Sequence, residues 1–386
     1  MESDDIPTRE KKYLMQVYSR MPLVVSHGAG SYLFDKDGKK YLDLVGAIAT
    51  NSIGYGNRAV AKALADQSRK LINATNLYYT EAQVQLAEKL NFLSGLDKAF
   101  FCNSGAEAVE AAIKLARKST KKKEILATTN GFHGRTFGAL SATGKETIKK
   151  PFEPLVPHFR HIPYNNPAAL KRAIGKETAA FIVEPIQGEA GIIVPDPNYL
   201  IQVWELCEEK DVLLIVDEIQ TSLRTGHWFA FQRPKISPDI VTLAKGIANG
   251  VPIGATLAKE GVAGAFEKGD HGSTFGGNSL SCAAALATLD FIEKNDLILQ
   301  AKLKGDYLFE QLISLNSPAV NEVRGRGLMA AVELKKDNAA DIAKKALKKG
   351  LIVNKSTDKV LRFLPPLTIT EKELDEGVRK LEKVLK

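Results

Sequence analysis

Lys245 is a lysine at a place where the local pattern argues against a charged residue. The apolar stretch 240–244 runs directly into it, and a glycine-containing segment, 246–250, follows. A buried lysine is costly unless it is paired or neutral, and a neutral lysine amine is a nucleophile toward carbonyl groups. Taken alone, the stretch favours a solvated strand end, so the neighbouring motifs must decide between the two interpretations.

Two other stretches have the residues of an anion site. In FFCNSGAEAVEAA, a predicted helix begins with Ser104 and Glu107 in capping-box spacing, and Gly105 lets an anion approach the free backbone N–H groups. In HGSTFGGNSLSCAAA, Ser273 and Thr274 lie in a glycine-rich loop before another helix. Ordinary helix capping and turn chemistry explain each stretch equally well by itself. Neither is a P-loop, because no Gly-Lys-Ser/Thr follows.

Three further motifs follow predicted strands. NGFHGRTFGAL offers Phe132 as a stacking surface and Arg135 as a two-pronged carboxylate ligand. Asp217 and Glu218 end the apolar run LLIVDE, and adjacent strand residues point to opposite faces, so they cannot form one acid/base dyad. VEPIQGEAG places Glu189 in a turn after another strand. Each motif alone has an ordinary structural explanation.

Together these motifs match the needs of pyridoxal phosphate. Its phosphate needs donors at helix starts, its ring needs a stacking partner, and its pyridine nitrogen needs an acid such as Asp217. Its aldehyde needs a lysine amine, and Lys245 follows the next predicted strand after Asp217. In this combination, Lys245 is interpreted as a reactive amine instead of a solvated strand end.

Alternating apolar runs and helical patterns predict the element order that positions these residues. The middle of the chain reads as an α/β domain with a mostly parallel sheet wrapped by helices. The predicted strands are 98–102, 124–129, 179–185, 212–218, 239–245 and 253–258, and the predicted helices include 106–118, 198–209 and 279–294.

The two ends of the chain read differently from the middle. Residues 30–44 predict a hairpin with its turn at Asp37-Gly38. From about residue 300 the pattern is α+β: a long helix, a strand over 323–334, a helix over 339–349, strands at LIVN and VLRFLP, and a closing helix from 371. We expect a large domain over 61–295 and a small domain built from 1–60 and 296–386.

Composition and charge restrict the function classes. The 386 residues carry a net charge of +8, but the lysines are scattered along helical segments without a DNA-binding module or interleaved aromatics. No nucleic-acid partner, membrane span or metal site is expected, and three cysteines without zinc or disulfide spacing fit a reducing cytoplasm. An NAD enzyme would need a Gly-x-Gly-x-x-Gly motif, which is missing. A binding protein without cofactor or catalysis remains an alternative from a different class.

The motifs resemble the class III (ω-amino acid) aminotransferases, which are fold-type I pyridoxal phosphate enzymes. The resemblance covers nearly the whole chain and is greatest to the short acetylornithine aminotransferases. It rests on NSGAEAVEAAIKLAR, GFHGRTFGALSATG, FIVEPIQGEAG, LLIVDEIQT, PDIVTLAKG, GSTFGGNSLSCAAA, EVRGRGLM and LRFLPPLTIT, in this order. GYGNRA, TSLRTG and Ala106 depart from the family's usual pattern, but none of them involves Lys245 or Asp217.

The resemblance implies a role for each cofactor-site residue. Lys245 would bind the cofactor covalently and move the proton during transfer, while Asp217 would pair with the pyridine nitrogen. The remaining cofactor ligands would be Ser104, Gly105, Ala106, Phe132, Glu218, Ile219 and Gln220. Thr274 would reach the phosphate bound by a neighbouring subunit, so a homodimer is expected.

The resemblance also implies a substrate site. Arg135, assisted by Ser273, would hold the distal carboxylate, and Arg362 the α-carboxylate of glutamate or 2-oxoglutarate. Glu189 would pair with Arg362 when an ω-amino substrate is bound. The implied reaction transfers the terminal amine of N-acetylornithine to 2-oxoglutarate. Ornithine, succinylornithine, 4-aminobutyrate and carrier-protein-linked lysine or ornithine are the alternative donors.

Overall fold

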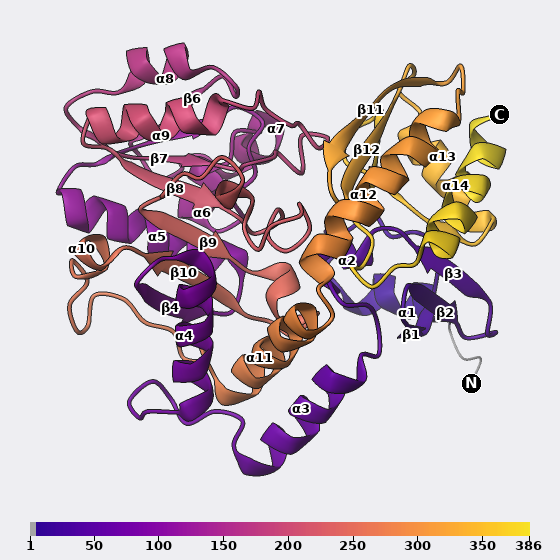
Figure 1. Cartoon of the computed structure of the whole chain (residues 1–386), viewed down its shortest axis with the longest axis horizontal. Helices are drawn as coiled ribbons and strands as arrows, with labels where there is room; N and C mark the ends of the chain where they lie inside the picture. The colour runs from indigo at the N-terminus through magenta and orange to yellow at the C-terminus, as the bar shows by residue number, and fades with distance from the viewer. Residues whose placement is uncertain (1–4) are drawn as a thin grey trace.

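The computed structural model describes residues 5–386 and contains three β-sheets. A seven-stranded sheet with the order β4-β10-β9-β8-β7-β5-β6 lies on the left in Figure 1. Two four-stranded sheets, β1-β2-β3-β13 and β11-β12-β15-β14, gather on the right, where the first and last parts of the chain meet. No helix among residues 5–386 is both long and apolar enough to span a bilayer.

All six strands expected in the middle of the chain are present in the seven-stranded sheet. Its neighbours pair in parallel except around β10, which is antiparallel to both β4 and β9. The edge strand β6 was not expected from the sequence. The strand bounds are β4 Lys98–Cys102, β5 Glu124–Thr128, β6 Phe159–Ile162, β7 Thr178–Val183, β8 Leu213–Asp217, β9 Ile240–Leu243 and β10 Gly254–Ala258.

Helices bury both faces of this sheet, which explains why its strands read as continuous apolar runs. Ile215 and Ile240 join the core beside α5, whereas Val216 and Val241 join the core on the other face. The helices of this region are α3 Arg58–Lys70, α4 Glu81–Ser94, α5 Gly105–Thr120, α6 Phe137–Ala142, α7 Glu146–Lys149, α8 Pro167–Ala173, α9 Tyr199–Glu209, α10 Glu260–Ala263 and α11 Ser279–Lys294. Three short 3₁₀ helices are η1 Lys150–Phe152, η2 Ala230–Gln232 and η3 Lys245–Ala248.

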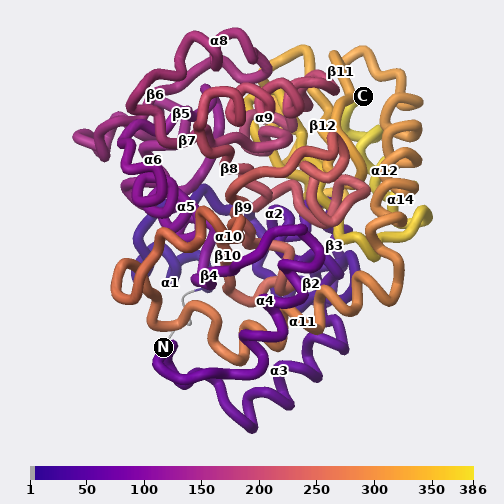
Figure 2. The backbone as a smooth tube through the Cα atoms, turned by 60° about the vertical axis from the view of Figure 1, so that its left-hand side comes forward, coloured from indigo at the N-terminus to yellow at the C-terminus, as the bar shows by residue number. Residues whose placement is uncertain are grey.

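The N-terminal and C-terminal segments share a sheet. The expected hairpin is present as β2 and β3, and β13 pairs in parallel with β3, with Leu351 opposite Leu42. Figure 2 shows the same meeting of the indigo and yellow ends from another side. This pairing supports a small domain built from both ends of the chain, whose bounds stay a prediction. The elements are α1 Ile6–Tyr13, β1 Val25–Ala29, β2 Tyr32–Asp35, β3 Lys40–Asp43, α2 Gly46–Ala49, α12 Leu297–Ser314, β11 Val320–Arg326, β12 Met329–Leu334, α13 Ala339–Lys348, β13 Leu351–Ile352, β14 Asn354–Lys355, β15 Val360–Phe363 and α14 Glu371–Leu385.

The expected single strand over 323–334 is wrong. The segment belongs to an antiparallel pair, β11 and β12, with Arg326 opposite Met329. Gly327 makes the turn with φ of +56°, a left-handed conformation that glycine adopts without a Cβ penalty. A Cβ there would lie 2.3 Å from the Arg224 carbonyl oxygen, so the tight packing against that loop also requires glycine.

A left-handed turn at α2 shapes one wall of the candidate site. Its four residues have φ between +51° and +67°, which costs a non-glycine residue about 1–2 kcal/mol. The buried carboxylate of Asp43 accepts the Val45 N–H at 2.7 Å, and the Tyr55 hydroxyl donates to its other oxygen at 2.5 Å. Tyr55 lies in GYGNRA, so this departure from the family pattern supplies the partner of Asp43.

Replacing Tyr55 with Phe should therefore destabilise the fold. The Asp43 carboxylate would stay buried with one donor fewer, which costs about 1–3 kcal/mol. Urea unfolding at fixed protein concentration should show a lower midpoint with an unchanged slope. Tyr13→Phe is the matched control, because that side chain is exposed and its hydroxyl makes no hydrogen bond within residues 5–386. Equal midpoints for both variants would contradict the role given to Tyr55.

Candidate active site

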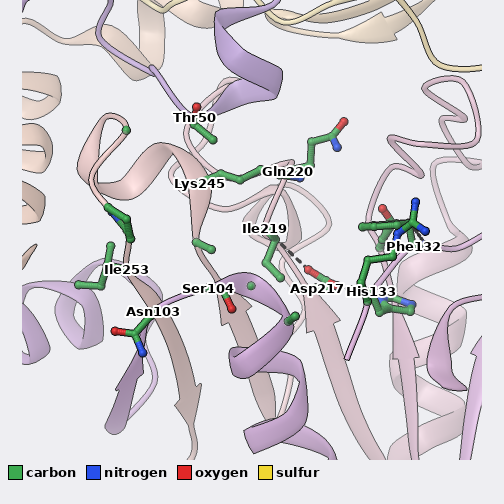
Figure 3. Close-up of a pocket in the computed structure, with 18 of the residues that line it drawn as sticks. Thr50, Asn103, Ser104, Phe132, His133, Asp217, Ile219, Gln220, Lys245 and Ile253 are labelled. Carbon is green, nitrogen blue, oxygen red and sulfur yellow. Dashed lines mark hydrogen bonds and ion pairs between the residues drawn. The ribbon is translucent and has the colours of Figure 1, made fainter. Parts of the chain in front are cut away.

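A cavity of about 460 Å³ lies at the carboxyl ends of β8 and β9. In open α/β sheets, this edge is where ligands bind. Figure 3 shows the side chains that converge on it from β8, the start of α5, the loop after β5 and the segment after β9. The predicted residues that line it are Ser104, Gly105, Ala106, Phe132, Arg135, Asp217, Ile219, Gln220 and Lys245.

Lys245 enters this cavity from the first residue of η3, directly after β9. Its φ of +48° is rare for a residue with a side chain, and such strain is found preferentially at functional sites. Within residues 5–386, its amine makes no hydrogen bond or ion pair. Burial lowers the pKa of Lys245 below its usual value, although nearby Glu189 opposes the shift. A larger share of the amine is therefore neutral and nucleophilic than for a solvated lysine.

Asp217 forms a buried pair with His133 on the other side of the cavity. The His133 Nδ1 and Asp217 Oδ2 atoms are 2.7 Å apart, and the Ile219 N–H donates to Asp217 Oδ1 at 3.1 Å. Burial opposes protonation of His133, but the Asp217 carboxylate raises the pKa of His133 above its usual value. His133 Nε2 is buried and has no partner within the described chain. His133 was not among the site residues expected from the sequence, although it follows Phe132 directly.

The start of α5 offers backbone donors to an anion. The Ser104 side chain accepts the Glu107 N–H at 3.2 Å, which confirms the predicted helix cap. No described residue accepts a hydrogen bond from the N–H groups of Gly105 and Ala106. A Cβ on Gly105 would lie 2.7 Å from the Ile219 side chain, so a larger residue at this position would force that side chain, two residues after Asp217, to shift.

The loop after β5 supplies an aromatic ring, a cation and contact with a buried acid. The Phe132 N–H donates to Glu184 Oε2 at 3.0 Å, which ties the loop to the end of β7. The exposed Arg135 guanidinium lies 5.8 Å from the centre of the Phe132 ring. Burial raises the pKa of Glu184 to about 7. Near neutral pH this acid is therefore close to its titration midpoint, unlike a solvated glutamate.

A second cluster, formed by Arg362, Glu189 and Gln220, lies beside the cavity. The Arg362 side chain is only 1% exposed, and it donates to Glu189 Oε1 and, at 3.3 Å, to Gln220 Oε1. Gln220 Nε2 donates to Glu189 Oε1 at 3.2 Å. Burial alone would raise the pKa of Glu189, but Arg362 offsets this effect and the pKa lies below its usual value. Gln220 lines the cavity and is hydrogen-bonded to both partners of this ion pair, so it connects the pair to the cavity wall.

Glu218, an expected cofactor ligand, does not turn its side chain toward the cavity. As the strand geometry predicted, its carboxylate lies on the face opposite Asp217, where it accepts from the Thr221 hydroxyl and, at 2.9 Å, from the Phe231 N–H. It is fully buried and does not line the cavity. Its contacts instead fix the loop that follows β8.

Ser273 and Thr274 also lie outside this cavity. The Ser273 hydroxyl accepts from Asn103 Nδ2 at 3.1 Å, so its loop is held beside the end of β4. Thr274 is exposed. The loop containing these residues therefore borders the site without closing it within one subunit.

The protein belongs to the class III aminotransferases, whose family model matches residues 13–385. An acetylornithine aminotransferase of Archaeoglobus fulgidus is 48% identical over 371 residues, which cover 96% of this chain and 97% of that protein. The acetylornithine aminotransferase of Methanocaldococcus jannaschii is also 48% identical, with 97% of this chain and 96% of that protein covered.

Solved structures agree on the fold. An ornithine aminotransferase from Toxoplasma gondii ME49 superimposes with a TM-score of 0.95 at 34% identity, covering 98% of this chain and 93% of that one. An acetylornithine aminotransferase from Elizabethkingia anophelis gives a TM-score of 0.88 at 33% identity, covering 98% and 97%. The expected α/β fold of the fold-type I enzymes is thereby confirmed, and so is the class of enzyme, a pyridoxal-phosphate-dependent aminotransferase.

The residues of the cavity fit this cofactor. They combine a half-buried amine, a buried carboxylate, an aromatic ring and N–H groups at a helix start, and neither the amine nor these N–H groups have a partner in the described part of the chain. These are the groups that the aldehyde, pyridine nitrogen, ring and phosphate of the cofactor require. The orphaned His133 Nε2 is a further buried polar atom at the cavity wall.

The raised pKa of Glu184 predicts a pH-dependent effect of Glu184→Gln on stability. Between the unfolded pKa near 4.5 and the folded value of about 7, the folded state binds more protons, so the Glu184 contribution to stability falls as pH rises. In the cofactor-free protein, the unfolding free energy of the variant relative to wild type should therefore increase by roughly 3 kcal/mol across this range. Urea unfolding from pH 5 to pH 8 measures the difference, and a constant difference would contradict the assignment.

Proposed function

We propose that this aminotransferase transfers the terminal amine of N-acetylornithine to 2-oxoglutarate, giving N-acetylglutamate 5-semialdehyde and glutamate, as in arginine biosynthesis. The observation that carries the proposal is the partly buried Arg362–Glu189 ion pair beside Lys245, whose amine has no partner among residues 5–386. Glu189 balances the charge of Arg362 and could move away from it. Such an arginine suits a site that binds two substrates in turn, of which only one places an α-carboxylate beside the guanidinium. The full-length relatives named acetylornithine aminotransferase support N-acetylornithine as the donor.

The roles of the residues follow from their contacts. Bound pyridoxal phosphate supplies a carbonyl that exchanges its oxygen for the amino group and a ring that withdraws electrons from the reacting carbon. In the proposal, the N–H groups of Gly105 and Ala106 bind the phosphate, and Asp217, oriented by His133, holds a proton on the pyridine nitrogen. Lys245, with its lowered pKa, accepts and returns a proton at the reacting carbon.

Substrate orientation is assigned to the two arginines. Arg362 receives the α-carboxylate of 2-oxoglutarate once Glu189 has moved away, because a bidentate carboxylate can replace that contact. Arg135, exposed at the cavity mouth, is proposed to hold the distal carboxylate, with Ser273 assisting. Gln220 contacts both partners of the ion pair, so it is placed to keep Arg362 oriented while Glu189 moves.

We also propose a homodimer in which Thr274 completes the site of the other subunit. The exposed Thr274 adjoins the segment 73–79, whose Asn76 donates to the Ser273 carbonyl at 3.0 Å. This segment exposes Leu77 and Tyr79, with Tyr79 fully exposed, and Phe275 is 61% exposed beside them. Contiguous exposed apolar side chains next to an open catalytic loop support burial against a second copy. A biosynthetic role and three free cysteines support a cytoplasmic location.

A panel of amine donors tests the proposed reaction. With saturating 2-oxoglutarate, N-acetylornithine should give the highest kcat/KM, ahead of ornithine, succinylornithine, 4-aminobutyrate and carrier-protein-linked lysine. Glutamate formation is the measurement. Lys245→Ala is the control, and it should lose both the activity and the visible absorbance of the bound cofactor. A clear preference for ornithine, the substrate named for the Toxoplasma gondii neighbour, would replace the proposed donor without changing the enzyme class.

The ion pair predicts a separate effect of Glu189→Gln on KM. A neutral amide competes less well than a carboxylate for Arg362, so the KM for 2-oxoglutarate should fall roughly tenfold. Steady-state kinetics at saturating donor measures this change, with Glu205→Gln on the exposed side of α9 as the matched control. An unchanged KM would show that Glu189 does not compete with the substrate carboxylate.

A further inference from the structure

A second cavity, of about 270 Å³, lies outside the site around Lys245 and is lined by three cations. Arg326 comes from the end of β11, whereas Arg233 and Lys235 come from the segment after η2 on the other side. The cavity thus joins the sheet β11-β12-β15-β14 to the segments that flank α9. None of these three residues has a role in the proposed transamination.

Arg326 has an informative neighbour on the same strand. Arg324, two residues earlier, forms ion pairs with Glu322 at 2.7 Å and Glu333 at 2.6 Å, and it also donates to the Gly191 carbonyl. The half-buried Arg326 side chain has no hydrogen bond or ion pair to any residue in 5–386. A partly desolvated guanidinium without partners is unfavourable, and an anion would remove that cost.

The other two cations of the cavity, Arg233 and Lys235, also have no acidic partner among the described residues, and their side chains make no hydrogen bonds to these residues. Burial, together with nearby Arg233, lowers the pKa of Arg326. Asp196 is the acid at the cavity wall, but it is exposed and lies beyond ion-pair distance of all three cations. The three cations therefore give the cavity a positive charge that no described acid pairs with.

The remaining wall of the cavity is apolar. Pro195, Pro197, Leu200 and Ile201 cover the side toward α9. Apolar walls reduce the local dielectric constant, so that charge interactions in the cavity are stronger than on an open surface. The first turn of α9, whose cap residue Asn198 makes no side-chain cap bond, adds a positive potential of the same sign.

We propose that Arg326, Arg233 and Lys235 form a binding site for a small dianion such as a phosphate monoester or a dicarboxylate. Two guanidinium groups and an ammonium group match the charge and the several acceptor oxygens of such a ligand. A cavity of this size holds a small metabolite and no macromolecule. Arg326 lies at the end of β11, whereas Arg233 and Lys235 follow η2. A bound anion would therefore stabilise the contact between these two segments.

The test uses the holoenzyme saturated with pyridoxal phosphate, so that phosphate cannot bind at the start of α5. Inorganic phosphate and succinate are titrated separately, with sodium chloride at equal ionic strength as the reference, and succinate is also titrated against Arg135→Gln to separate binding beside Lys245 from binding at the second cavity. At least one dianion should raise Tm in a saturable manner and bind in calorimetry. Arg326→Gln and Arg233→Gln should each weaken binding roughly tenfold, as expected for loss of a charge-assisted hydrogen bond. Which dianion binds more tightly distinguishes the two ligand sources.

Arg172→Gln is the matched control, because Arg172 is an exposed arginine on α8 without a partner in the described chain. It should bind the anion as wild type does. Transaminase activity at saturating substrate confirms that each variant is folded. If Arg326→Gln fails to fold, the variants Arg233→Gln and Lys235→Gln decide the outcome, because both side chains are exposed. A wild-type enzyme that responds to neither dianion beyond the chloride reference overturns the proposal. So does binding that survives both Arg326→Gln and Arg233→Gln.

Discussion

Strands β8 and β9 are parallel neighbours, with Asp217 opposite Thr242, and this register places the two chemical groups of the site at one sheet edge. Asp217 is the last residue of β8, and Lys245 follows three residues after Thr242 on the adjacent strand. Parallel strands end at the same edge of a sheet, so a buried acid and a reactive amine share one cavity without any long-range loop. The other site residues are arranged around this pair.

The polar groups behind the pair determine its protonation. His133 contacts Asp217, and Glu184 contacts the Phe132 backbone, so the Asp217 carboxylate is part of a buried network. Burial shifts the pKa of Lys245 downward and that of Glu184 upward, toward the neutral form in both cases. Removing water from the cavity wall therefore favours an amine that can act as a base.

The small sheets position Arg362 beside the cavity. Arg362 lies on β15, opposite Ala331 of β12, and its guanidinium reaches Glu189 and Gln220 from the other part of the molecule. Arg224 joins the same parts, because it donates to the carbonyl groups of Ala49, Leu328 and Pro365. The position of Arg362 thus depends on contacts between segments that are far apart in the chain.

The sequence by itself determined the element order of the central sheet, the cap at Ser104 and the opposite faces of Asp217 and Glu218. These features follow from apolar runs, capping spacing and strand alternation, all of which are local. The resemblance to the class III aminotransferases also predicted that Lys245 and Asp217 share a site and that Arg362 pairs with Glu189. Only the tertiary structure decided that His133 is the partner of Asp217 and that β11 turns at Gly327 into β12. It also showed that Arg326 has no partner within residues 5–386 while Arg324 forms two ion pairs, because partners and burial depend on segments that the local sequence pattern does not bring together.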